Sequence, residues 1–241
     1  MIDIKGKSAI VTGGGSGVGK AITTALVKEG VNVMIASRRK TLLKEIAEEL
    51  NELEGGKVIY SELDVRSKAE CQSVVDKTLE AFGQVDILVN NSGLGVGSLV
   101  VDTSEEDWDM VVDTNLKGTF LMSQAVLPNM IKRKTGYILN IASQAAKRGY
   151  AQAGAYCASK FGVVGLADAL QEEVYEHNIL VHSLCPALIQ TPEPKSQEEL
   201  KSDLLQVQHI ADTALFVLKQ PSTVKLDDIG LYARPTGRTR S

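Results

Sequence analysis

The sequence has few cysteines, and those it has do not form a recognisable framework. Three cysteines occur, at Cys71, Cys157 and Cys185, and no two of them stand in a Cys-x-x-Cys pattern. An odd, scattered set argues against a disulfide scaffold and against a cysteine zinc site. The three histidines, His177, His182 and His209, are equally scattered. We therefore expect no metal site and a reducing environment.

Long apolar runs and an excess of positive charge are also missing. No apolar run reaches the roughly 18–20 residues that a membrane-spanning helix needs. Residues 1–7 lack the apolar stretch of a secretory signal. The net charge is −4, which does not suit a broad surface for nucleic acid. These absences predict a cytoplasmic protein that binds neither membranes nor nucleic acid.

The composition is that of a globular protein with one sizeable core. Of 241 residues, 44% are apolar and 23% are charged. This balance argues against disorder, and the length suits one large domain or two small ones. We find no fixed-period repeat and no linker rich in Pro, Gly or Ser. One domain over residues 1–241 is therefore the expected organisation.

Short, nearly continuous apolar runs alternate with segments of helical periodicity. The runs predict strands at 8–12, 32–36, 57–61, 86–89, 137–141, 179–184 and 229–233. Helices are expected at 18–29, 42–53, 69–82, 108–133, 155–176 and 209–218. Strands that are apolar throughout and separated by helices indicate βαβ units and a parallel sheet, buried on both faces. Residues 191–207 are the least regular, and predict either a substrate-binding loop or a solvated connector.

The first strand runs directly into Thr12-Gly13-Gly14-Gly15-Ser16-Gly17-Val18-Gly19, where a helix pattern begins. Glycine suits positive φ or the close approach of a ligand, and a helix start attracts a pyrophosphate. An ordinary glycine-rich turn would look similar. Its position at the first strand–helix junction favours a dinucleotide site.

The second strand ends in Ala36-Ser37-Arg38-Arg39. A carboxylate there would bind the adenosine ribose hydroxyls and select NAD. Arginine instead suits a ribose 2′-phosphate. The residues Ser37, Arg38 and Arg39 thus predict NADP(H) rather than NAD(H), although they could be only the basic flank of the next helix.

Further motifs follow in a fixed order along the chain. They are Asp64-Val65, Asn90-Asn91-Ser92-Gly93, Asn115, Ser143, Tyr156-Cys157-Ala158-Ser159-Lys160 and Pro186-Ala187-Leu188-Ile189-Gln190-Thr191. Together with the glycine-rich turn, they resemble the short-chain dehydrogenase/reductase family, and in general character its bacterial 3-oxoacyl reductases. Ser92 and Ala187 replace the family's Ala and Gly. The resemblance implies a Rossmann-type, doubly wound parallel sheet of about seven strands in a three-layer αβα sandwich.

The resemblance implies a catalytic set of Asn115, Ser143, Tyr156 and Lys160. Tyr156 and Lys160 stand at i and i+4, so they share a helix face. A nearby ammonium would lower the pKa of the phenol, which is near 10 in free tyrosine. Tyr156 would then exchange a proton with the substrate oxygen while Ser143 hydrogen-bonds it. The resemblance also implies that Asn115 supports a water leading protons to Lys160.

The remaining family positions are cofactor contacts. The resemblance assigns Asp64 and Val65 to the adenine, Ile189 and Thr191 to the carboxamide, and Lys160 to the nicotinamide ribose. It places Asn91, Ser92, Gly93, Pro186, Ala187 and Tyr156 in the same site. Ala187 lacks the conformational range of glycine, which puts the turn before Thr191 in question.

The expected activity is hydride transfer between NADP(H) and a carbonyl or secondary alcohol, with a 3-oxoacyl or other small keto compound as substrate. Residues 94–98, 144–150 and 191–207 would line the substrate pocket. Two alternatives stay open: a non-catalytic NADP(H)-binding sensor or scaffold, and an NAD-dependent alcohol dehydrogenase. Apolar residues on the helix after Ala155, together with the family resemblance, imply a homodimer or homotetramer.

Overall fold

In the computed structural model, described for residues 1–191, 201 and 203–234, all seven strands form one parallel sheet. The order across the sheet is β3-β2-β1-β4-β5-β6-β7. The strands are β1 (Ser8–Thr12), β2 (Asn32–Ser37), β3 (Val58–Glu62), β4 (Ile87–Asn90), β5 (Gly136–Ile141), β6 (Ile179–Pro186) and β7 (Ile229–Leu231). This is the expected Rossmann-type sheet, and each expected strand is present within a few residues.

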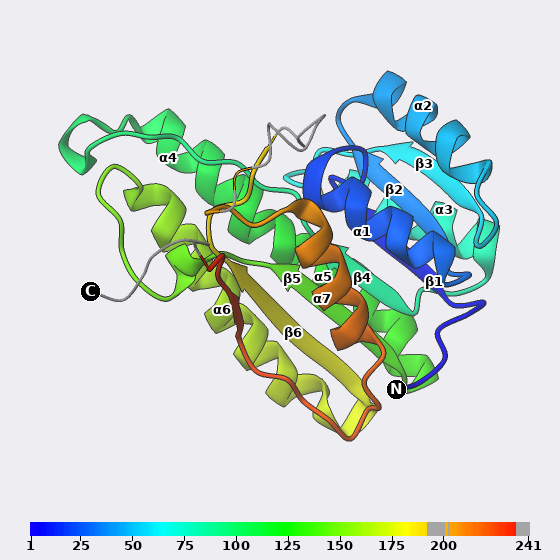
Figure 1. The fold of residues 1–241 in the computed structure, drawn as a ribbon. Coiled ribbons are helices and arrows are strands. Elements are labelled where there is room, and N and C mark those ends of the chain that lie inside the picture. The colour runs from blue at the N-terminus through cyan, green and yellow to red at the C-terminus, as the bar shows by residue number, and fades with distance from the viewer. Residues whose placement is uncertain (192–200, 202, 235–241) are drawn as a thin grey trace.

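Helices cover both faces of the sheet, giving the expected three layers (Figure 1). They are α1 (Gly17–Lys28), α2 (Lys40–Asn51), α3 (Lys68–Phe82), α4 (Glu105–Val112), α5 (Gly118–Arg133), α6 (Gly154–Val174) and α7 (Val207–Leu218). One apolar core lies under α1, α2 and α7, and another lies under α3, α5 and α6. Alternate side chains of β6 point to opposite faces of the sheet and pack into the two cores, which is why the sequence of this strand is apolar throughout.

The helix expected at 108–133 is interrupted. Its first part, α4, begins at Glu105, three residues before the predicted start, where Ser104 caps it by accepting a hydrogen bond from the Asp107 backbone amide. A π-helical turn, η2 (Asp113–Lys117), then separates α4 from α5. Such turns widen the helix by one residue and occur often at functional sites. Asn115 lies in this turn.

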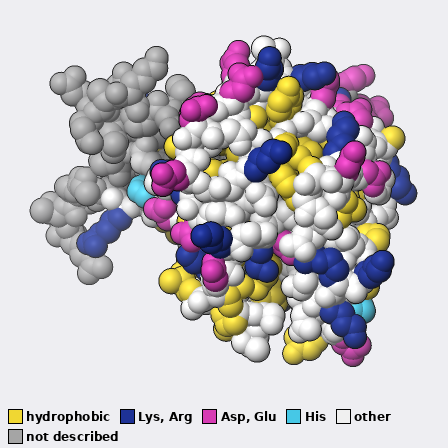
Figure 2. All heavy atoms as spheres, turned by 90° about the vertical axis from the view of Figure 1, so that its right-hand side faces the viewer, with side chains coloured by type: hydrophobic (Ala, Val, Ile, Leu, Met, Phe, Trp, Pro, Cys, Tyr) yellow, Lys and Arg dark blue, Asp and Glu magenta, His cyan; other side chains and the backbone are white. Residues whose placement is uncertain are grey.

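Three short 3₁₀ turns complete the described elements: η1 (Val100–Asp102), η3 (Gln144–Ala146) and η4 (Tyr175–His177). In the described part of the chain, no helix is long and apolar enough to cross a membrane. Figure 2 shows acidic and basic side chains intermixed on the face that it draws. All three cysteines are buried free thiols, as expected for small core residues.

The order in which strands are added reverses between β1 and β4. From β1 the sheet extends to one side through β2 and β3, and from β4 it extends to the other side through β5, β6 and β7. In open parallel sheets a ligand binds beyond the carboxyl ends of the strands at such a switch point. The glycine-rich turn after β1 and the Asn90–Gly93 segment after β4 both end there. The sheet therefore brings together two motifs that lie far apart in the sequence.

Candidate active site

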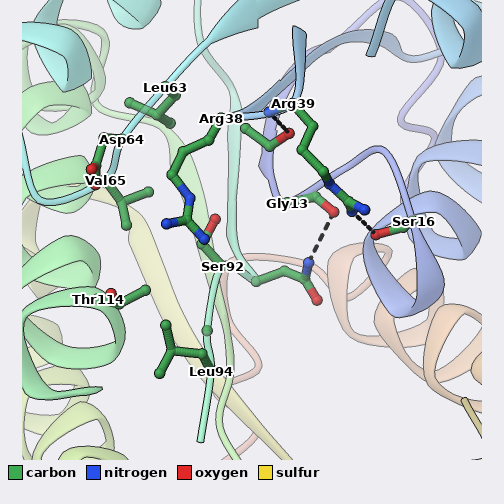
Figure 3. Close-up of a pocket in the computed structure, with 13 residues that line it drawn as sticks. Gly13, Ser16, Arg38, Arg39, Leu63, Asp64, Val65, Ser92, Leu94 and Thr114 are labelled. Carbon is green, nitrogen blue, oxygen red and sulfur yellow. Dashed lines mark hydrogen bonds between the residues drawn. The ribbon is translucent and has the colours of Figure 1, made fainter. Parts of the chain in front are cut away.

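A cavity of about 250 Å³ opens beyond the carboxyl ends of β1, β2, β3 and β4. Many of the expected cofactor residues line it (Figure 3). They are Gly13, Ser16, Ser37, Arg38, Arg39, Asp64, Val65, Asn91, Ser92 and Gly93. The fold thus assembles most of the dinucleotide motifs around one space.

The glycine-rich turn lies tightly against the segment that follows β4. Gly13 has a φ of +66°, and a Cβ there would stand 2.8 Å from Nδ2 of Asn91. That same Nδ2 donates a 3.0 Å hydrogen bond to the carbonyl oxygen of Thr12. A Cβ on Gly19 would be 2.2 Å from the Gly13 carbonyl oxygen. Glycine suits Gly13 because of its positive φ and the Asn91 amide beside it, and it suits Gly19 because backbone occupies the space of a side chain.

The hydroxyl of Thr12 strengthens this junction. Its Oγ1 accepts hydrogen bonds from the backbone amides of Asn91 and Ser92, each at 3.0 Å. Gly15, Gly17 and Val18 belong to the turn and to the start of α1, and they are not among the residues that line the cavity. Their place fits a backbone role in the turn.

The two arginines after β2 take different directions (Figure 3). Arg39 donates a 2.8 Å hydrogen bond to Oγ of Ser16, the residue that precedes α1. Arg38 extends into the space between Val65 and Ser92. A cationic wall therefore faces the glycine-rich turn across the cavity, where a phosphate group would lie between them.

Asp64 is held by a neighbouring cation. The Arg66 guanidinium donates to its carboxylate, with Nε 2.9 Å from Oδ1 and 3.1 Å from Oδ2. This hydrogen bonding lowers the pKa of Asp64 to about 2, against the opposing effect of burial. Asp64 is therefore an ionised acceptor at the cavity wall, with its orientation fixed by Arg66.

The expected catalytic side chains converge at the start of α6. The Ser143 hydroxyl, just beyond β5, lies near enough to the Tyr156 phenol to lower its pKa. Lys160 lies one turn along α6, with Nζ 5.7 Å from the centre of the Tyr156 ring. A Cβ on Gly95 would contact the same ring at 3.3 Å, so the segment after β4 borders this group as well.

Burial shifts the pKa values of both Lys160 and Tyr156. Lys160 is 6% exposed, and loss of water lowers its pKa to about 8. Burial also raises the pKa of the Tyr156 phenol, while the Ser143 hydrogen bond lowers it in part. The expectation that Lys160 would lower the phenol pKa is therefore wrong for this arrangement. The ammonium instead donates to the Ile141 carbonyl oxygen at 2.7 Å.

Asn115 fastens the segment after β4 to α6. Its Oδ1 accepts from the Leu94 amide, and its Nδ2 donates to the Leu94 carbonyl oxygen, each at 2.9 Å. Nδ2 also donates to Oγ of Ser159 at 2.9 Å. The side chain is 1% exposed, and its direct contacts fix the position of Gly93 beside Lys160.

The residues after β6 form a separate part of the site. Pro186 ends the strand, the Ala187 amide donates to the Leu231 carbonyl oxygen at 2.8 Å, and Ile189 forms a bridge with Leu205. These residues and Thr191 do not line the cavity described above. Most of the expected substrate loop, residues 192–200 and 202, lies outside the described residues.

Alanine fits the turn after β6. Among the residues that the structure describes, the non-glycine positions with positive φ are Lys134, Gln152 and Asn178. Ala187 therefore keeps an ordinary backbone conformation, and the replacement of the family's glycine strains nothing here.

Sequence reasoning missed two lining residues. Leu63 and Thr114 complete the cavity, and each directly adjoins an expected site residue. Adjacency was the available signal, yet it does not tell which neighbour points inward. Leu94, expected in the substrate pocket, lines this cavity as well. Tyr232 was also missed: its phenol donates to Gln144, the residue after Ser143, across 88 positions of sequence, and no local signal indicates that contact.

Comparison with known proteins identifies the class. Residues 7–201 match the family model described as short chain dehydrogenase. An oxidoreductase of Staphylococcus saprophyticus is 34% identical over 229 residues, which are 95% of this chain and 98% of the relative. An oxidoreductase of Staphylococcus epidermidis is 31% identical over the same shares.

Solved structures agree with this classification. A variant of actinorhodin polyketide ketoreductase with NADPH superimposes with a TM-score of 0.85 at 32% identity, covering 94% of this chain and 96% of the other. An alcohol dehydrogenase from the archaeon Thermococcus sibiricus, complexed with 5-hydroxy-NADP, gives 0.86 at 29% identity, covering 95% and 99%. The fold and the site define a nucleotide-binding α/β protein. More particularly, the chain belongs to the short-chain dehydrogenase/reductase family of oxidoreductases, as the motifs indicated.

Proposed function

We propose that the protein transfers a hydride between NADP(H) and a carbonyl or secondary alcohol, acting as a reductase of a 3-oxoacyl or other small keto compound. The observation that carries this proposal is the convergence of Tyr156 and a buried Lys160, with Nζ 5.7 Å from the ring centre, next to the Ser143 hydroxyl. Two hydroxyl groups that converge on one point can bind and protonate one substrate oxygen.

The residues divide the chemistry between them. A nicotinamide cofactor supplies or accepts the hydride when it is bound. In reduction, the Tyr156 phenol gives its proton to the substrate oxygen, and the Ser143 hydroxyl donates a hydrogen bond to that oxygen as negative charge develops. In oxidation, the Tyr156 phenolate removes the alcohol proton. Lys160, as an ammonium beside the ring, attracts the negative charge that develops on the phenolate as the proton leaves.

The residues present fit a dinucleotide. A Cβ on Gly17 would meet nothing within 4 Å, so the backbone at the start of α1 is open to a pyrophosphate. We assign the pyrophosphate to the glycine-rich turn, with its members Gly13, Gly15, Ser16, Gly17, Val18 and Gly19. Asp64 and Val65 would hold the adenine.

The nicotinamide half of the cofactor would lie toward the catalytic pair. Ile189 and Thr191 would contact its carboxamide, with Pro186 and Ala187 forming the turn that carries them. Lys160 would bind the nicotinamide ribose. Asn91, Ser92 and Gly93 lie between the two halves, where β4 ends.

The choice of NADP(H) over NAD(H) depends on Arg38 and Arg39. Both line the cavity opposite the glycine-rich turn, and Ser37 lies beside them. A guanidinium binds a phosphate dianion in two hydrogen bonds and has no such partner on a bare ribose. The two solved relatives that hold NADPH and 5-hydroxy-NADP support the same choice.

The substrate class is supported by the ketoreductase relative. Residues 94–98, of which Gly95 borders the Tyr156 ring, and residues 144–150, which follow Ser143, would contact the substrate. Of the cations there, Lys147 donates a 3.0 Å hydrogen bond to the carbonyl oxygen of Asp228. Arg148 stacks on the Tyr150 ring, 4.9 Å from its centre. Neither is a dedicated anion site, which favours a neutral keto group near the catalytic pair.

We further propose a homodimer or homotetramer that works in the cytoplasm. Large apolar side chains on three neighbouring helices are exposed: Trp108 at 41%, Phe120 at 42% and Phe161 at 46%. Such side chains suit a contact with a second copy. Buried free thiols at all three cysteines suit a reducing compartment.

Cofactor consumption tests the activity. The purified protein would receive NADPH or NADH in parallel with 3-oxoacyl thioesters, diketones, sugars and ketosteroids. We expect oxidation of NADPH with one substrate class, and none in Tyr156→Phe. Tight NADPH binding without turnover across the panel would favour a sensor, whereas equal use of both cofactors would overturn the assignment to Arg38 and Arg39.

A further inference from the structure

Gln144 connects the catalytic serine to two distant segments of the chain. It follows Ser143 directly, begins η3 and is 3% exposed. Its Nε2 donates a 2.6 Å hydrogen bond to the Cys185 carbonyl oxygen on β6. Its Oε1 accepts a hydrogen bond from the phenol of Tyr232. Both ends of the buried amide are therefore bonded, one by the sheet and one by the C-terminal segment.

The C-terminal segment is placed to make this contact by its pairing with β6. Gly230 is in register with Cys185. A Cβ on Gly230 would stand 3.1 Å from Nε2 of Gln144 and 3.3 Å from the Tyr232 ring. The absence of a side chain at this position thus lets Tyr232 and Gln144 pack closely. Tyr232 is 63% exposed, and its contact with Gln144 is partly buried.

Ser143 depends on the same turn for its orientation. Its Oγ accepts a hydrogen bond from the Ala145 amide at 3.1 Å. One peptide bond separates Ser143 from Gln144, so a movement of the Gln144 backbone would displace the serine. A buried amide oxygen that lost its donor would move to find another, because an unpaired buried polar atom is costly.

We propose that Tyr232 and Gln144 are positioning residues that hold the turn carrying Ser143, so that the C-terminal segment sets the position of the Ser143 hydroxyl relative to the Tyr156 phenol. The inference rests on the proposed function for its kinetic consequence, while its structural consequence is independent of any substrate. It gives the segment after β7 a role in the reaction although it is distant in sequence from every family motif.

The first test is structural and needs no substrate. Crystal structures of the wild-type protein and of Tyr232→Phe would be compared at the distance between the Ser143 and Tyr156 hydroxyl oxygens. Phenylalanine keeps the ring and removes only the hydroxyl that Gln144 accepts from. We expect Gln144 to change its hydrogen bonding and the Ser143 hydroxyl to move away from the Tyr156 phenol. A variant in which this distance stays at its wild-type value would overturn the proposal.

The second test is kinetic and uses a double-mutant cycle. We expect kcat of Tyr232→Phe to fall roughly tenfold, with KM for NADPH unchanged. Gln144→Met, which keeps the volume and loses both bonds, should lower kcat at least as much. If the two residues act as one unit, the double variant should be no slower than Gln144→Met. Fully additive losses would contradict a shared role.

Matched controls separate positioning from folding. Tyr175→Phe removes another tyrosine hydroxyl, from a side chain that is 74% exposed at the far end of α6, and should leave kcat unchanged. Thermal unfolding and NADPH binding would show that each variant is folded. If the wild-type protein turns over no substrate, the proposed function fails, and the crystal structures still decide the positioning role. Wild-type turnover with unchanged kcat in Tyr232→Phe would reject that role alone.

Discussion

The ammonium of Lys160 donates a hydrogen bond to the backbone carbonyl oxygen of Ile141, 2.7 Å away, at the end of β5. Two residues after Ile141 comes Ser143, so the lysine is joined to the strand that carries the serine. The same ammonium lies 5.7 Å from the centre of the Tyr156 ring. One buried charge therefore contacts the backbone on one side and faces the proton donor on the other.

The pH dependence of stability follows from this burial. The pKa of Lys160 is lowered to about 8 in the folded protein from 10.5 in its ordinary state. Between these values the unfolded chain binds more protons than the folded one, so the free energy of unfolding rises with pH. We expect this rise between pH 8 and 10.5 in the wild-type protein, relative to Lys160→Met. Chemical denaturation of both proteins across this range measures it, and a constant difference would contradict the burial effect.

Substitutions of Tyr156 and of Ser143 should reduce the activity by different amounts. Tyr156→Phe loses the group that exchanges the proton, a contribution of roughly 10²–10⁴-fold. Ser143→Ala removes one hydrogen bond to the developing charge, worth roughly 10²–10³-fold. Both variants should bind NADPH like the wild-type protein, as fluorescence titration would show. A Tyr156→Phe protein with wild-type kcat would refute the catalytic assignment.

Cofactor preference should follow Arg38 and Arg39. Replacing either by Ala removes a charge-assisted contact to the 2′-phosphate, and we expect the Kd for NADPH to rise roughly tenfold. The Kd for NADH should change little. Lys44→Ala is a matched control, since its side chain is 61% exposed on α2 and pairs with Glu48. Isothermal titration with both cofactors provides the comparison. An equal rise in the Kd for NADH and for NADPH would indicate that the substitution disturbs the cavity rather than a contact with the 2′-phosphate.

Several elements of the fold could be predicted from the sequence, because their residues carry the signal locally. The first strand was predicted at its observed bounds, since a strand buried on both faces reads as an unbroken apolar run. The π turn at Asp113–Lys117 was not predicted. Its extra residue shifts the periodicity only slightly within a long apolar helix pattern.

The site was predictable as motifs and much less as contacts. Gly13 and Arg38 were expected at the cofactor cavity and both line it. The rise in the Tyr156 pKa was not expected, because burial is a property of the folded chain and its effect outweighs that of the Ser143 hydrogen bond. The bond between Gln144 and Tyr232 likewise depends on how β7 pairs with β6. No spacing in the sequence encodes it.

Acid should reduce the contribution of the Asp64 carboxylate to the free energy of unfolding. Arg66 lowers the pKa of this carboxyl to about 2, below its ordinary value of 3.8. A depressed carboxyl stabilises the fold above the ordinary value, and this stabilisation is lost as the pH falls from 3.8 toward 2. The difference in free energy of unfolding between the wild-type protein and Asp64→Asn should therefore shrink over this range. A difference independent of pH would show that the ion pair contributes nothing to it.

The glycine-rich turn should tolerate substitution unequally. A Cβ on Gly19 would stand 2.2 Å from the Gly13 carbonyl oxygen, so Gly19→Ala must displace the backbone of the turn. Gly17 has a φ of +50° and open space around it, so Gly17→Ala meets only conformational strain of about 1–2 kcal/mol. We expect Gly19→Ala to lose NADPH binding at least tenfold more than Gly17→Ala. Binding titrations and thermal unfolding of both variants test this order. Both glycines belong to α1, which begins at Gly17 and continues through Gly19. If Gly17→Ala instead lost more binding than Gly19→Ala, the start of α1 would be free to move away from Gly13, and Asn91 would not hold it there.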